Sequence, residues 1–192
     1  MKRQSGITLV EILVTVLVLA IGLLGIAALQ TTAMTGNYTS YQYTQAAFIA
    51  ESMFERMRAN RNAYASGNSY YNLSAGIAPA VTSTCYNQTC TPQQQALWDM
   101  GNFYAQVTGS SALTGVKTLT AQDSGGKNIG ALPGGQVSIV CDNPFPIATP
   151  GTCVISIYWD PGRTGTASST KYSCDPTDPT ALKCFRLAVI LP

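Results

Sequence analysis

The chain contains no histidine, so the most frequent general base and the most frequent metal ligand of proteins are both missing. It also lacks a glycine-rich nucleotide loop, and its only clustered carboxylates are Asp175 and Asp178. Charged residues make up 10% of the chain, with 11 Lys and Arg against 9 Asp and Glu. This bulk charge argues against nucleic-acid binding. The composition also argues against an enzyme, and we expect no catalytic residue and no cofactor.

Cysteine is absent before residue 85, and an even number of cysteines confined to one region is typical of disulfides in an oxidising compartment. A zinc site is the alternative. It is disfavoured because four residues separate Cys85 from Cys90 and the other spacings are long, so no metal is expected. Six cysteines allow many connectivities. Nearest-neighbour pairing predicts the disulfides Cys85–Cys90, Cys141–Cys153 and Cys174–Cys184.

Residues 7–29 form a long apolar run that follows Lys2 and Arg3. As a helix, this run would measure about 35 Å and would span a hydrocarbon core of about 30 Å. The two basic residues place the N-terminus in the cytoplasm and the rest of the chain outside it. A secretory signal peptide is the rival interpretation, but its apolar region should be shorter, about 7–15 residues, and end at a small-residue cleavage site.

Glu11 lies near the start of the apolar run, and no charged residue follows it until after Leu29. A carboxylate in hydrocarbon is costly, so an acid in such a segment indicates a functional site. The alternative is that Glu11 lies at the level of the lipid headgroups and is solvated there.

Residues 6–11, Gly-Ile-Thr-Leu-Val-Glu, resemble the leader junction of type IV pilins and type II secretion pseudopilins, with Ile7 where the family usually has Phe. The resemblance implies that a prepilin peptidase cuts between Gly6 and Ile7 and that the new N-terminus, Ile7, is methylated. It also implies that Glu11 pairs with the N-terminal amine of a neighbouring subunit during assembly. Such a pair relieves the cost of two isolated charges in lipid.

The helix is expected to continue beyond the membrane, from about Thr8 to about Arg61, because no proline occurs before Pro79. Residues 30–62 would be its amphipathic half, with an apolar stripe at spacings of three and four. The stripe consists of Ala46, Ile49, Ala50, Met53, Phe54 and Met57. Three tyrosines beyond the span either contact neighbouring subunits and the membrane interface or pack on the head: Tyr38, Tyr41 and Tyr43.

Residues 63–192 are expected to form a globular periplasmic head. Thr91, Pro92 and Gln94 predict a helix start with a capping box, and the helix should run to about Val107. Its expected apolar face consists of Leu97, Met100, Tyr104 and Val107. Strands are expected at 136–141, 153–159 and 184–191, with Phe185, Leu187 and Val189 as the core face of the last. The fold class is therefore α+β: a long N-terminal helix packed on a small antiparallel sheet with disulfides.

Two further stretches resemble the PilV type of minor pilin: Glu-Arg-Met-Arg-Ala-Asn-Arg at residues 55–61 and Leu-Pro-Gly-Gly at 132–135. The resemblance implies a minor pilin that initiates or caps a type IV pilus and supports twitching motility and adhesion. Its partners would be other minor pilins, the major pilin, the inner-membrane assembly platform and the prepilin peptidase. A tip adhesin is a further candidate partner. The implied location is the inner membrane, with a single pass, and then the pilus tip.

Two other functions stay open. A minor pseudopilin of a type II secretion system would carry the same N-terminal segment. A tip-exposed binding module for a surface, DNA or an adhesin would use the loops at 63–84 and 161–172. Asp175 and Asp178 suit calcium by their oxygen atoms, but two ligands fall short of the six or more that calcium takes, so a polar loop is the better interpretation.

Overall fold

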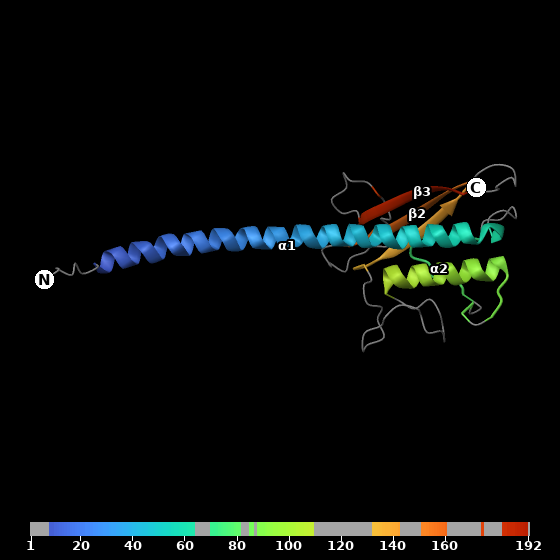
Figure 1. Cartoon of the computed structure of the whole chain (residues 1–192), viewed down its shortest axis with the longest axis horizontal. Helices are drawn as coiled ribbons and strands as arrows, with labels where there is room; N and C mark the ends of the chain where they lie inside the picture. Colours follow the sequence, from blue (N-terminus) through green and yellow to red (C-terminus); the bar gives the residue numbers. More distant parts are fainter. Residues whose placement is uncertain are drawn as a thin grey trace. The chain divides into compact units, whose positions relative to one another are not determined.

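The computed structural model describes residues 8–63, 70–81, 85–86, 88–109, 132–142, 151–160, 174 and 182–191. Its elements, shown in Figure 1, are helix α1 (Leu9–Ala59), a short 3-10 helix η1 (Arg61–Ala63), helix α2 (Pro92–Thr108) and strands β1 (Gln136–Cys141), β2 (Gly151–Trp159) and β3 (Lys183–Leu191). The predicted α+β class is confirmed. By its internal contacts the chain divides into two compact units, Met1–Tyr41 and Gln42–Pro192.

The described part of the first unit is helical from Leu9 to its end at Tyr41. Thr8 caps this helix, because the backbone N–H of Glu11 donates to the carbonyl and the hydroxyl of Thr8 at 3.1 and 3.4 Å. Large apolar side chains are exposed along it, from Leu9 at 78% to Met34 at 71%. An apolar surface of this extent needs apolar surroundings. By length and composition, the helix is able to cross a membrane.

Polar residues follow the apolar run without interrupting the helix, because their hydroxyl groups bond to carbonyls one turn earlier. Five side chains do so at 2.8–3.1 Å: Thr31, Thr32, Thr35, Thr39 and Ser40. Thr15 makes the same bond inside the apolar run, to the carbonyl of Ile12 at 2.8 Å. A hydroxyl that is satisfied in this way can lie in hydrocarbon without water.

The second unit contains a three-stranded antiparallel sheet in the order β1–β2–β3. Strand β2 begins at Gly151 and β3 at Lys183, slightly earlier than expected. An isolated bridge joins Leu73 to Ile139 of β1 through two backbone hydrogen bonds of 2.9 and 2.8 Å. Residues 63–84 were expected to be a loop, and no local pattern predicts this bridge, because its two residues lie more than sixty positions apart in the chain.

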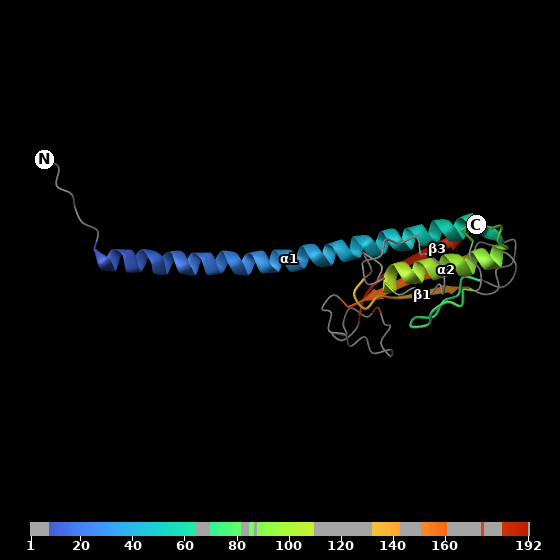
Figure 2. The same cartoon turned by 90° about the horizontal axis from the view of Figure 1, so that it is seen from below.

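The core of the second unit lies between the sheet and the two helices, which run side by side in Figures 1 and 2. Helix α1 buries one stripe against it: Gln42, Ala46, Ala50, Met53 and Met57. The predicted stripe is thus confirmed at four positions, and Ile49 and Phe54 are partly buried. The sheet contributes Ile139, Ile155, Ile157 and Trp159, and α2 contributes Met100, Phe103 and Val107.

Helix α2 begins with the predicted capping box. The Thr91 hydroxyl accepts from the backbone of Gln94 at 3.3 Å, and the Gln94 side chain accepts from the backbone of Thr91 at 2.9 Å. The buried face of α2 is wider than the predicted apolar face, since Trp98, Asp99 and Asn102 are buried as well. Asn102 tolerates burial because its amide donates to the Trp98 carbonyl at 2.9 Å. Two members of that face, Leu97 and Tyr104, are only partly buried.

The burial of the strands differs from a simple alternation of inside and outside. Ile155, Ile157 and Trp159 of β2 belong to the core, and Ser156 and Tyr158 between them are also buried. The central strand is therefore covered on both faces over this stretch. In β3, Val189 is buried, whereas Phe185 and Leu187 are only half-buried, because this strand lies at the edge of the described sheet.

Three disulfides join the nearest neighbours in sequence: Cys85–Cys90, Cys141–Cys153 and Cys174–Cys184. Cys141 and Cys153 lie directly opposite each other in the register of β1 and β2, with Cα atoms 4.0 Å apart, and both are buried. Cys90 directly precedes Thr91, the N-cap of α2. The Cys85–Cys90 disulfide therefore ties the segment at Cys85 to the start of this helix.

The Leu-Pro-Gly-Gly stretch leads into β1 and makes backbone hydrogen bonds to α2 and to the residue that follows β2. The Leu132 N–H donates to the Val107 carbonyl of α2 at 3.1 Å, and the Pro133 carbonyl accepts from Asp160 after β2 at 2.8 Å. Gly134 has a φ of 58°, which favours glycine, and Gly135 leads into β1. A Cβ atom on Gly135 would overlap the backbone of Val107, so the closeness of the turn to α2 depends on this glycine.

We expect Gly135→Ala to destabilise the head by about 1–3 kcal/mol, because either α2 or the turn must move to make room for the added methyl group. Chemical denaturation of the detergent-solubilised full-length chain, followed by tryptophan fluorescence, measures the loss. Gly36→Ala is the matched control: nothing lies within 4 Å of an added Cβ there, and a helical Gly→Ala change should not destabilise. Equal effects of the two changes would contradict the close contact.

Candidate functional site

The N-terminal segment carries the processing and assembly residues predicted from the sequence. Gly6 and Ile7 lie outside the described residues, and Glu11 lies in the first turn of α1. Its position is favourable for the helix, since the partial positive charge of a helix N-terminus attracts a carboxylate. The sequence Thr8-Leu9-Val10-Glu11 also has the spacing of a capping box.

The capping box at Glu11 is only half formed. The Thr8 hydroxyl accepts from the Glu11 backbone, but the Glu11 carboxylate has no hydrogen-bond or ion-pair partner within the part of the chain that the structure describes. The neighbouring side chains Leu9, Val10, Ile12 and Leu13 are apolar and at least 50% exposed. The arrangement is thus an acid on an exposed apolar helix surface, with its oxygen atoms available to a cation.

The three tyrosines near the middle of α1 differ in their surroundings. The ring of Tyr43 packs edge-on against Trp159, with ring centroids 4.8 Å apart and an interplanar angle of 80°. Tyr43 therefore packs on the head. Tyr38 and Tyr41 are 39% and 60% exposed.

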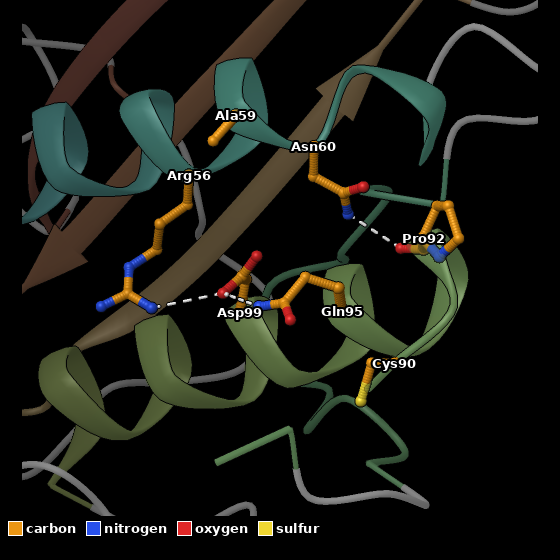
Figure 3. Close-up of a pocket in the computed structure, with 7 residues that line it drawn as sticks. All are labelled: Arg56, Ala59, Asn60, Cys90, Pro92, Gln95 and Asp99. Carbon is orange, nitrogen blue, oxygen red and sulfur yellow. Dashed lines mark hydrogen bonds and ion pairs between the residues drawn. The ribbon is translucent and has the colours of Figure 1, made fainter. Parts of the chain in front are cut away.

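A polar cluster that was not predicted from the sequence joins the end of α1 to α2. The side chain of Asp99, only 3% exposed, lies at its centre (Figure 3). One Asp99 oxygen accepts from the Arg56 guanidinium at 3.2 Å and from the Gln95 amide at 3.0 Å, and the other accepts from the Tyr71 hydroxyl at 3.3 Å. Asn60 donates to the Tyr71 hydroxyl at 3.0 Å and to the Pro92 carbonyl at 2.8 Å. An aspartate amid the apolar positions of α2 was the available signal for this cluster.

The electrostatics of the cluster follow from burial. Burial raises the pKa of the Asp99 carboxyl, and the hydrogen bonds and charges of Gln95, Arg56 and Tyr71 act in the opposite direction. Burial also raises the pKa of the Tyr71 hydroxyl, and the nearby Asp99 charge adds to this effect. The cluster therefore stabilises the packing of α1, α2 and the segment around Tyr71 only while the Asp99 carboxylate keeps its hydrogen-bond donors.

We expect Arg56→Gln to destabilise the head by roughly 1–3 kcal/mol near neutral pH, because a buried carboxylate loses its partly exposed cationic partner. Removing the Arg56 charge also raises the pKa of Asp99 in the folded protein further above the pKa of the same group in the unfolded chain. A group whose pKa is raised in the folded state favours folding below its unfolded pKa, and that contribution disappears as the pH rises through the folded pKa. The variant should therefore come closer to the wild type at pH about 5 than at pH about 8.

Denaturant midpoints of the full-length chain at both pH values measure this effect. Arg58→Gln is the matched control, because Arg58 and Glu55 form a long, exposed pair at 4.0 Å, and its loss should change stability by less than about 0.5 kcal/mol. A loss for Arg56→Gln that is identical at both pH values would refute the role given to Asp99.

Some predicted residues lie outside the described part of the chain: Asp175, Asp178, the loop at 161–172 and parts of the loop at 63–84. Among the described residues, no group of three or more Cys, Asp or Glu could hold a metal ion.

A long apolar N-terminal helix, a three-stranded antiparallel head and disulfides define a pilin-like fold. Residues 28–101 match the family model of the Tt1218-like type IV pilins, described as Type IV pilin Tt1218. Residues 1–27 match the model of the prokaryotic N-terminal methylation motif. No curated protein and no solved structure is significantly similar to the chain. Residues 28–101 are thus similar to a type IV pilin, and the methylation motif and the apolar helix fit a membrane-anchored pilin.

Proposed function

We propose that this protein is a minor pilin, resembling the PilV type, that initiates assembly or caps the tip of a type IV pilus. The observation that carries the proposal is the N-terminal methylation motif at residues 1–27, directly continuous with a type IV pilin match at 28–101. The exposed apolar half of α1, with a carboxylate that lacks a partner among the described residues, supports insertion followed by assembly.

In this proposal residues 1–6 are a leader, 7–29 the membrane segment, 30–62 the amphipathic half of the helix and 63–192 the periplasmic head. Prepilin peptidase cuts between Gly6 and Ile7, and Ile7 is then methylated. The N-terminus starts in the cytoplasm, and the three disulfides suit a head in an oxidising compartment. The intact mass of the purified protein tests this processing: loss of residues 1–6 with one added methyl supports it, and loss of nearly thirty residues rejects it.

The partners of the mature subunit would be other minor pilins, the major pilin and the inner-membrane assembly platform, with a tip adhesin as a further candidate. Deleting the gene should reduce piliation and twitching motility and leave exoprotein secretion intact. Co-purification of the membrane-anchored chain with pilin subunits, and its presence in sheared pili, test the same point directly. A secretion defect with normal pili would instead identify a pseudopilin of a type II secretion system.

A further inference from the structure

Helix α1 packs on the head through a stripe of small and flexible side chains. Ala46, Ala50, Met53 and Met57 are at most 1% exposed, and all four belong to the hydrophobic core. Alanine has no atoms beyond Cβ that could interlock with neighbours, and the unbranched methionine side chain adapts to irregular surroundings. A stripe of this kind buries apolar surface, but it holds the helix at one axial position only weakly.

The stripe nearly repeats itself after four residues. A shift of α1 by four residues toward its C-terminal end would move it by about 6 Å along the head. The buried site of Ala50 would then receive Ala46, another alanine. The site of Met53 would receive Ile49, and the site of Met57 would receive Met53. Apolar exchanges that conserve volume cost little, so these three sites scarcely oppose the shift.

The opposite shift is blocked by the stripe itself. A movement by four residues toward the N-terminal end would place Phe54 in the fully buried site of Ala50. It would also place Arg61 in the fully buried site of Met57. Overpacking of a core and burial of an unpaired charge are both strongly unfavourable. Only the shift toward the C-terminal end therefore needs a further obstacle.

A polar contact at the first end of the stripe opposes this shift. The Gln42 side-chain oxygen accepts from the buried Trp159 indole at 3.2 Å, and Gln42 itself is 1% exposed. The shift would separate Gln42 from the indole and move it into the fully buried site of Ala46. A longer, polar side chain would there replace a methyl group, which is costly in a packed core.

A second set of polar contacts lies at the other end, about 21 Å along the helix from Gln42. Arg56 donates to the buried Asp99 at 3.2 Å (Figure 3). Asn60, which directly follows the helix, donates to the Pro92 carbonyl at 2.8 Å. A displacement of about 6 Å exceeds the reach of a hydrogen bond, so the shift would take the Arg56 cation away from the buried carboxylate.

We propose that Gln42 at one end, and Arg56 with Asn60 at the other, are positioning residues, which fix the axial position of α1 on the head and exclude a second position four residues away. Directional polar contacts are able to set the register of helices whose apolar surfaces fit in more than one way. The register decides which residues of α1 the head covers and which ones, such as Phe48, other molecules reach. The device lies within the unit Gln42–Pro192 and is independent of the proposed function.

Double electron–electron resonance on the detergent-solubilised full-length chain measures the register. Nitroxide labels are attached to p-acetylphenylalanine, so that the cysteines stay in their disulfides. One label replaces Phe48, and the second replaces either Lys183 or Ile190, all of them exposed. Lys183 and Ile190 lie near opposite ends of β3, which runs beside this part of α1 in Figures 1 and 2. Lys183 pairs with Trp159, the partner of Gln42, and thus marks the end of β3 from which the shift moves the helix away.

The wild type should give one distance for each label pair. In the variant Gln42→Ala/Arg56→Gln/Asn60→Ala, a second population of at least about 10% of the molecules is expected. Its distance should be longer by up to about 6 Å for the pair with Lys183, and shorter by up to the same amount for the pair with Ile190. Arg56→Lys in place of Arg56→Gln keeps the cation and should reduce the second population by at least about twofold.

Met53→Ala is the matched control, because it opens a cavity in the core and leaves all the positioning residues in place, so it should keep one distance. A second population of equal size in this control, a single wild-type distance in the folded triple variant, or two distances that change in the same direction would overturn the proposal. If the triple variant shows no cooperative thermal unfolding, Gln42→Ala alone and Arg56→Gln with Asn60→Ala are measured instead. A second population in either supports the proposal, and a single wild-type distance in both overturns it.

Discussion

Replacing Glu11 with alanine is expected to remove the subunit from pili while it still inserts into the membrane. The apolar surface of α1 is unchanged by the substitution, so its affinity for lipid should persist or increase. What disappears is the carboxylate that, in the proposed function, neutralises the N-terminal ammonium of a neighbouring subunit. An uncompensated buried charge typically costs about 3–5 kcal/mol, so we expect incorporation to fall by at least about a hundredfold.

Immunoblots of sheared pili and of the membrane fraction measure incorporation and insertion in the same culture. Glu51→Ala is the matched control, because Glu51 is an exposed acid on the same helix, within the head, and its loss should leave both fractions unchanged. Leader cleavage in the Glu11 variant is checked by mass, so that a processing defect is not mistaken for an assembly defect. Normal amounts of the variant in pili would remove Glu11 from the assembly mechanism.

The largest loss of stability is expected from Trp159→Ala, at about 4 kcal/mol. Trp159 is fully buried, and its indole N–H donates to the Gln42 side-chain oxygen at 3.2 Å. The ring of Tyr43 also packs on the indole in a T-shaped arrangement. Alanine would leave a cavity and would deprive Gln42 of this hydrogen bond. The Gln42 amide nitrogen already has no partner among the described residues, so the buried side chain would be left without any such partner.

Chemical denaturation of the detergent-solubilised chain measures this effect, with Trp98 as the remaining fluorescent probe. Trp159→Phe should cost less than half as much, because it keeps most of the packing and loses the hydrogen bond. Phe48→Ala removes an exposed aromatic residue from the same unit and should change stability by less than about 0.5 kcal/mol. A loss at Trp159 as small as that at Phe48 would show that the indole does not anchor α1 to the sheet.

The features of this fold that could be predicted are local in the chain. The capping box of Thr91 and Gln94 is a contact between residues three apart, and it is present as expected. The apolar stripe of α1 repeats every three or four residues, and its buried members follow that period. The disulfide between Cys141 and Cys153 needs only a hairpin to bring two strand ends together, and the register does so.

The features that could not be predicted join residues far apart. Leu73 bridges to Ile139, Gly135 approaches Val107, and Arg56 reaches Asp99 across 43 positions. No local pattern specifies the hydrogen-bond donors of Asp99, because two of them come from α1 and from the segment at Tyr71 and only one from its own helix.

The amino-acid sequence by itself determined the apolar N-terminal helix, the acid near its start, the ends of α2 and the position of the strands, since each depends on composition or on neighbours within one or two turns. Tertiary structure alone decided which polar side chains are buried, which glycine must stay small, and which arginine pairs with the buried Asp99. Burial and hydrogen-bond partners depend on the surface that a distant segment presents, and that surface exists only after the chain has folded.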